Sequence, residues 1–201
     1  MRIPSLQNAD SRLVLALAFA VLLLLPACSI NVKKDKTGAE KKVDIETPVG
    51  GIHVTNNADV RDVGLPVYPG ARVKEKGDEG EEKSANVNIS SGLFGLKVVA
   101  IEYESDDPPE KLIAYYKDQL KKYGNVLECH TSRHGGHVNI EKSPRDSEGS
   151  RDVKCDSNDS GRTVELKVGT EDNQHVVAIE PRDKGCDFAL VYVKTRGKDT
   201  I

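Results

Sequence analysis

Residues 96–103 read LKVVAIEY and residues 107–124 read DPPEKLIAYYKDQLKKYG, and these two stretches decide the fold that the sequence predicts. The first stretch is apolar on both faces, as is typical of a strand in the interior of a sheet. The second places apolar and aromatic residues at helical spacing on one face, from Leu112 through Tyr116 to Leu120. A helix of this kind after a central strand is expected to pack on a face of the sheet.

The ends of the predicted helix carry the usual start and stop residues. Asp107 suits the N-cap position, Pro108 the first helical position and Glu110 the acid of a capping box. Gly124 suits the left-handed residue that follows a helix. The sequence therefore predicts one main helix over residues 107–124.

The flanking segments alternate apolar and polar residues in the manner of strands. A hairpin is expected over residues 43–55, with Pro48, Gly50 and Gly51 between its strands. Further strands are expected at 85–90, 126–127, 164–168, 176–179 and 188–193. No strand–helix–strand repeat is visible, so we expect an α+β fold in which an antiparallel β-sheet carries one main helix on a face.

The N-terminus has the pattern of a secretory signal. Arg2 and Arg12 precede an unbroken apolar run, LVLALAFAVLLLL, over residues 13–25. This run is shorter than the roughly 20 residues that a membrane-spanning helix needs, and it falls in the range of roughly 7–15 residues typical of the apolar part of a signal peptide. A signal peptide over residues 1–27 is the favoured interpretation. A transmembrane anchor and a secreted protein cut near Ala27 are the alternatives.

The residues that end this run, Leu25-Pro26-Ala27-Cys28, resemble the lipobox of bacterial lipoproteins. The resemblance implies that Cys28 is acylated, for example with palmitate, and becomes the first residue of the mature chain. Two or three acyl chains hold a protein on a bilayer stably, whereas one binds only marginally. Ser29 resembles the sorting signal for the outer membrane, so the expected location is the bacterial cell envelope, on the outer membrane and facing the periplasm.

Residues 28–42 are polar and rich in lysine, which is typical of a solvated linker. We expect them to form the lipidated cysteine and a flexible tether. Residues 43–201 are then expected to form a single α+β domain.

The stretch LPVYPGA at residues 65–71, followed by strands and the tyrosine-rich helix, resembles a widespread group of uncharacterised bacterial envelope proteins. The similarity covers about residues 43–195. It implies an antiparallel sheet with a single helix, and it brings no known reaction with it.

Three cysteines remain besides Cys28, in a compartment that permits disulfides. They allow one disulfide in three ways. We expect a bond between Cys129 and Cys155, because it would tie down the polar loop 141–162, which has few apolar residues of its own. Cys186 precedes an apolar strand pattern and is expected to be a buried free thiol; a catalytic thiol is the alternative.

His130, His134 and His137 form the one cluster of metal-ligand residue types, and they could bind Zn²⁺ or Cu²⁺. Their spacing matches no standard zinc site, so a polar hairpin tip that contains histidines is the alternative interpretation. No other cofactor is expected.

The composition and motifs exclude several classes of function. The net charge of -3 and the 4% of aromatic residues give no basis for binding nucleic acid. No G-x-S-x-G, H-E-x-x-H or P-loop motif is present. The sequence therefore predicts a non-enzymatic, lipid-anchored module that binds another envelope protein or component. A metal-binding lipoprotein and a hydrolase with an unrecognised site are the alternatives.

Overall fold

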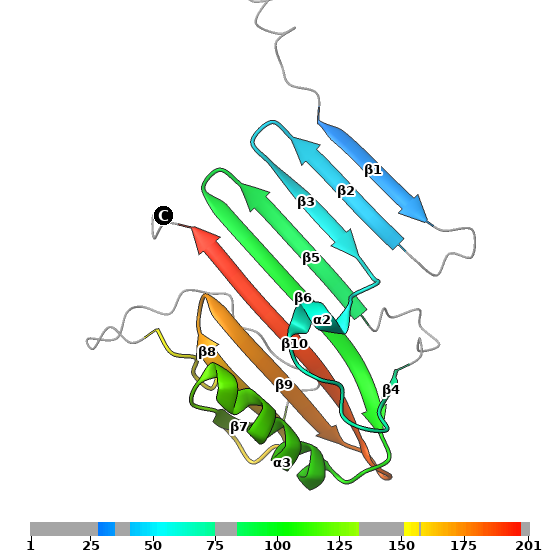
Figure 1. Cartoon of the computed structure of the whole chain (residues 1–201), viewed down its shortest axis with the longest axis vertical. Helices are drawn as coiled ribbons and strands as arrows, with labels where there is room; N and C mark the ends of the chain where they lie inside the picture. The colour runs from blue at the N-terminus through cyan, green and yellow to red at the C-terminus, as the bar shows by residue number, and fades with distance from the viewer. Residues whose placement is uncertain (1–27, 35–40, 75–83, 133–150, 157, 198–201) are drawn as a thin grey trace, which may run out of the picture.

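A computed structural model of the chain describes residues 28–34, 41–74, 84–132, 151–156 and 158–197. These residues form one ten-stranded sheet in the order β1-β2-β3-β5-β6-β10-β9-β8-β7, and the short β4 pairs with the end of β6 (Figure 1). All of the strand pairs are antiparallel.

The bounds of the elements follow in chain order. The strands are β1 (Ser29–Lys34), β2 (Lys41–Thr47), β3 (Gly50–Thr55), β4 (Arg72–Val73), β5 (Ser84–Ser91), β6 (Phe94–Ser105), β7 (Leu127–Thr131), β8 (Thr163–Thr170), β9 (Asn173–Pro181) and β10 (Cys186–Gly197). The helices are α2 (Val60–Val63), α3 (Pro109–Leu120) and the 3₁₀ turn η1 (Lys121–Tyr123).

The main core lies between α3 and one face of the sheet. Leu112, Tyr116 and Leu120 are fully buried on the inner face of α3, which packs on β8 and β9. Alternate residues of β10, such as Phe188 and Leu190, point into the same core. Each of these side chains contributes about 1.5–3 kcal/mol by leaving water, so α3 is held mainly by apolar burial.

Tyr116 also connects the helix to the loop before β4. Its hydroxyl accepts a hydrogen bond from the Tyr68 backbone N–H at 3.0 Å and donates one to the Pro66 carbonyl at 3.3 Å. Burial raises the pKa of this hydroxyl far above its ordinary value. The LPVYPGA stretch therefore folds against the helix through a neutral, buried phenol.

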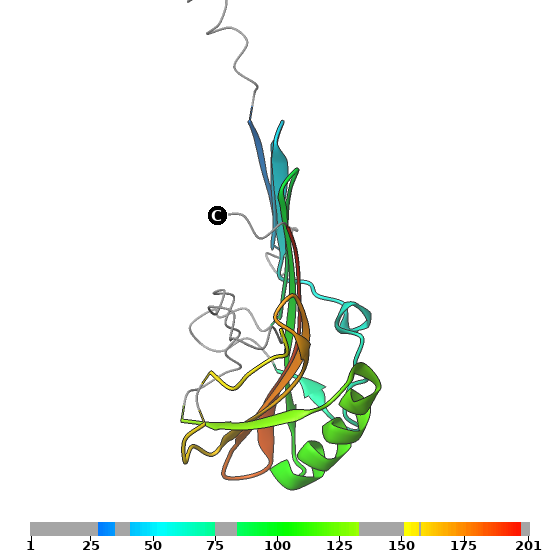
Figure 2. The same cartoon turned by 90° about the vertical axis from the view of Figure 1, so that its left-hand side faces the viewer.

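The two ends of the sheet differ in thickness. Figure 2 shows α2 and α3 on one side of the lower strands and residues 151–156 on the other side. We call β1, β2 and β3 the wing; neither of the described helices covers it (Figure 2). Within the described residues, the wing is thus a single layer that continues the covered part of the sheet.

The expected α+β class is wrong, because the fold is dominated by its sheet. The ten strands leave only α3 and two short helical turns among the described residues. Strands form at β1 and β4, where the sequence pattern predicts none, and with them the fold is rich in β-strands.

The expected tether also needs correction at residues 29–34, which form β1 and pair with β2. The alternation of Ile30 and Val32 with Asn31 and Lys33 is a strand pattern. The lysines around it hid this pattern, because they make the average composition of the segment resemble that of a linker.

The predicted helix is confirmed as α3, but its start is shifted. Pro108, not Asp107, is the N-cap, and Pro109 takes the first turn, where its missing N–H costs nothing. Asp107 instead accepts hydrogen bonds from the Tyr68 hydroxyl at 2.9 Å and from Lys111 at 2.7 Å. The predicted hairpin at 43–55 is formed by β2 and β3, and the predicted central strand is β6.

Replacing Tyr116 by Phe should lower the free energy of unfolding by about 1–3 kcal/mol, because the Tyr68 N–H loses its acceptor inside the protein. Tyr115→Phe is the matched control, since no hydrogen bond of the Tyr115 hydroxyl is described. Urea unfolding of both variants measures the difference. Equal losses in the two variants would contradict the role given to the Tyr116 hydroxyl.

Candidate functional site

Cys28 is exposed and directly precedes β1. The apolar run at residues 13–25 lies outside the described residues. None of the described helices has the length and apolar character needed to cross a membrane. The sulfur of Cys28 is therefore accessible at the point where the first strand begins.

The predicted disulfide between Cys129 and Cys155 is confirmed. Cys129 is opposite Glu165 of β8, so the bond holds residues 151–156 against the face of the sheet away from α3. Cys186 is a buried free thiol, as expected. Burial raises the pKa of Cys186 to about 11, so at neutral pH the group is a protonated thiol and a poor nucleophile.

The predicted metal cluster is described only at His130. Its Nε2 lies 3.3 Å from Oε1 of Glu128, its neighbour on β7. His134 and His137 lie outside the described residues. Within the part of the chain that the structure describes, no three His, Cys, Asp or Glu side chains gather as metal ligands would.

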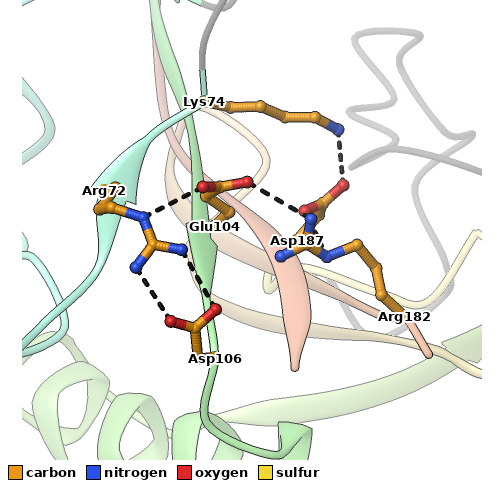
Figure 3. A network of polar contacts seen from close by, with 6 residues as sticks. All are labelled: Arg72, Lys74, Glu104, Asp106, Arg182 and Asp187. Carbon is orange, nitrogen blue, oxygen red and sulfur yellow. Dashed lines mark hydrogen bonds and ion pairs between the residues drawn. The ribbon is translucent and has the colours of Figure 1, made fainter. Parts of the chain in front are cut away.

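Charged residues gather where β4, β6 and the β9–β10 turn meet (Figure 3). Arg72 on β4 is opposite Glu104 on β6, and its Nε lies 3.1 Å from Oε1 of Glu104. The two other nitrogens of Arg72 donate to Asp106 at 3.0 and 3.1 Å. The paired hydrogen bonds from Arg72 lower the pKa of Asp106, so this carboxylate stays ionised.

The same cluster continues onto β10. Arg182 lies 3.3 Å from Glu104 through Nη1 and 3.0 Å from Asp187 through Nε. Lys74 approaches the other oxygen of Asp187 at 2.5 Å. The three cations pair with the three carboxylates of the cluster, so their charges cancel. The buried Oδ1 of Asp187 lies near Arg182 but accepts no hydrogen bond from the described residues.

This arrangement of ion pairs is better suited to holding neighbouring strands together than to catalysing a reaction. The ion pair of Arg72 with Asp106 is exposed and worth about 0–1 kcal/mol. The pairs of Arg182 with Glu104 and of Lys74 with Asp187 are partly buried, and together the pairs order the short β4 against β6. Sequence reasoning missed the cluster because Arg72 and Glu104 lie far apart in the chain. Only the strand register brings them together.

A second charged group is buried beneath the disulfide-linked segment. Lys167 Nζ lies 2.6 Å from Asp156 and 3.2 Å from Glu165, and the side chains of Lys167 and Glu165 are only 3% and 4% exposed. The strand alternation at 163–168 predicts that both face solvent. They are buried instead because the chain around Cys155 passes over that face.

His175 occupies the opposite face, next to α2 and η1. Its ring stacks on Tyr123 at 3.9 Å between centroids and lies 4.8 Å from the ring of Tyr192. Burial, and to a smaller extent nearby Lys122, lowers the pKa of His175 from 6.5 to about 4. The imidazole is therefore neutral at physiological pH and acts as a packing group.

The described surface hollows contain no recognisable reactive pair. One hollow of about 440 Å³ lies between the turn after α3 and the end of β8, and Asn125 and Asp152 are among its polar lining residues. A second, of about 290 Å³, lies near Thr131 and Arg162. Neither combines a nucleophile with a histidine base among its lining residues.

Replacing Lys167 by Met should lower the free energy of unfolding by about 3–5 kcal/mol, because the buried carboxylate of Glu165 loses its ion pair with Lys167. Lys97→Met is the matched control: Lys97 pairs with Asp62 at a partly exposed site and should cost less than about 1 kcal/mol. Chemical unfolding at neutral pH compares them. A small loss for both variants would contradict the assignment of Lys167 to a buried ion group.

The neutral state of His175 predicts a loss of stability in weak acid. The unfolded chain takes up the proton near pH 6.5 and the folded chain only near pH 4, so stability is unaffected above pH 6.5 and falls as the pH drops toward 4. The loss from this group reaches about 3 kcal/mol. His175→Phe should remove that part of the pH dependence, measured as unfolding free energy against pH. If the free energy of unfolding falls equally with pH in the wild type and in His175→Phe, the role given to His175 is wrong.

Comparisons of the chain with protein-family models, with curated proteins and with solved structures find no match. The likeness to bacterial lipoproteins and to envelope proteins with the YPGA loop therefore rests on the sequence motifs alone.

Proposed function

We propose that the chain is a lipid-anchored protein of the bacterial cell envelope, held at the membrane by acyl chains on Cys28, and that it binds another envelope component without catalysing a reaction. The observation that carries the proposal is the order of the N-terminal segments. An apolar run at residues 13–25 leads through Leu-Pro-Ala to Cys28, which is exposed and begins the described part of the chain.

Cleavage before Cys28 would leave β1 whole, because the strand starts at Ser29. Two or three acyl chains on one sulfur and one amine would then bind a bilayer stably without a spanning helix. On this proposal the protein lies on the outer membrane and faces the periplasm.

Three features favour binding over catalysis. The free thiol Cys186 is buried and protonated. The charged cluster around Glu104 is neutral and internally paired. β1 is the last strand at its end of the sheet, so its outer edge has no strand partner among the described residues, and another strand can add to such an edge. A module with such an edge and a compact core is suited to hold a partner.

Lipidation should be lost in Cys28→Ser and kept in Ser29→Ala, because only the first change removes the acylated sulfur. The N-terminal peptide of each protein, purified from bacterial membranes, gives the result by mass spectrometry. The wild-type and Ser29→Ala peptides should begin at residue 28 and carry the added mass of acyl chains. Globomycin, which blocks lipoprotein cleavage, should cause the wild-type precursor to accumulate.

Two outcomes would contradict this proposal. An unmodified Cys28 in membrane-derived protein would remove the lipid anchor. Unchanged processing of Cys28→Ser would show that cleavage does not depend on a lipobox.

A further inference from the structure

The strand register places Cys28 at the same end of the sheet as two hairpin turns. Ser29 is opposite Glu46, at the end of β2, and this end of β2 turns into β3. The adjacent pair β5 and β6 turns at the same end, where Ser90 is opposite Gly95 (Figure 1). We call this end the anchor rim; it comprises Cys28, residues 47–50 and residues 91–94.

The anchor rim exposes large apolar side chains at its turns. Val49 is 78% exposed, Leu93 is 88% exposed and Phe94 is 43% exposed. Turns at this position normally carry polar residues, glycine or proline. The rim as defined contains no charged residue, and the charged side chains of Arg196, opposite Gly95, and of Glu46, opposite Ser29, lie just behind it. Exposed apolar side chains at two adjacent turns favour an interaction surface over a solvated edge.

Both turns hold their apolar tips in place with a hydroxyl group. Thr47 Oγ1 donates to the Gly50 carbonyl at 2.7 Å. Ser91 Oγ accepts from the Phe94 N–H at 2.9 Å and from the Leu93 N–H at 3.3 Å. The tips are thus presented in ordered turns, which reduces the entropy lost when they are buried by a partner.

A row of aliphatic residues lies behind the rim on one face of the sheet. The cross-strand register aligns Ile30, Ile45, Ile52, Ile89 and Leu96 in this row. Ile30, on the outermost strand, is 68% exposed. The row is two residues from the rim, or about 7 Å along the strands. Side chains of interfacial proteins reach about 5–10 Å into the boundary between lipid head groups and acyl chains.

We propose that the anchor rim inserts into the surface of a phospholipid bilayer, with Val49, Leu93 and Phe94 among the acyl chains next to Cys28. This inference rests on the proposed lipid anchor and adds an orientation to it: the strands rise from the membrane and the β9–β10 turn points away. The position of Cys28 supports a lipid occupant, because this exposed cysteine lies on the rim and the proposed acyl chains would enter the bilayer there.

The area of the rim distinguishes a lipid surface from a second copy of the chain. A stable protein interface buries about 800 Å² on each partner, far more than three tip side chains supply. A bilayer needs no complementary surface and accepts isolated apolar side chains. A lipid surface is therefore the occupant that suits two separate tips beside an acylated cysteine.

The chain contains no tryptophan, so a single introduced indole reports its own surroundings. Leu93→Trp and Val49→Trp place the indole on the rim. Lys184→Trp is the control, in the exposed turn between β9 and β10 at the opposite end. Each full-length variant is expressed, purified from membranes and reconstituted into phosphatidylethanolamine–phosphatidylglycerol vesicles, some with brominated acyl chains.

We expect a blue shift of emission and quenching by brominated lipid for both rim variants, and neither effect for Lys184→Trp. Rim emission that is insensitive to brominated lipid would overturn the proposal. So would a blue shift that appears without lipid together with a doubled mass in solution, since a second copy would then cover the rim. The mass of the Cys28 peptide tests the lipid anchor separately from the insertion of the rim. If Cys28 is acylated but the rim indoles are not quenched, the proposed anchor stands and the proposed orientation is wrong.

Discussion

The pairing of β6 with β10 is the interaction on which the rest of the fold depends. The two strands run side by side from Cys186 opposite Ser105 to Gly197 opposite Phe94. Along this register, alternate residues face α3 and the others face the opposite side. A shift by one residue would exchange the two sets, so the same register fixes the apolar core, the charged cluster around Glu104 and the position of the anchor rim.

Local sequence patterns were sufficient for elements that bury one side. The amphipathic helix and the central strand could be predicted from their periodicity. The Cys129–Cys155 bond could be predicted because the polar loop 141–162 has few apolar residues to hold it. The pattern of β1 was weaker, since lysines adjoin it and none of the described helices packs on it. The ion pair of Arg72 and Glu104 and the burial of Lys167 could not be predicted, because each depends on a segment distant in sequence.

The sheet buries charged side chains in one region and exposes aliphatic side chains in another. Charged Lys167 and Glu165 are buried where the disulfide-linked segment covers the sheet, while aliphatic Ile30 and Val32 are exposed on the wing. The strands that α3 and residues 151–156 cover are stabilised by apolar burial and by the Cys129–Cys155 disulfide. The wing depends on backbone hydrogen bonds, each worth about 0.5–1.5 kcal/mol, and local opening is expected to begin at β1.

The start of β1 at Cys28 has a mechanical consequence. A tensile force applied at this residue along the strand would load the ladder between β1 and β2 in shear, so that its hydrogen bonds share the load. A force applied across the strand would instead open the ladder one bond at a time, like a zipper. The direction in which the chain leaves its attachment point therefore decides how much pulling the first strand withstands before it detaches.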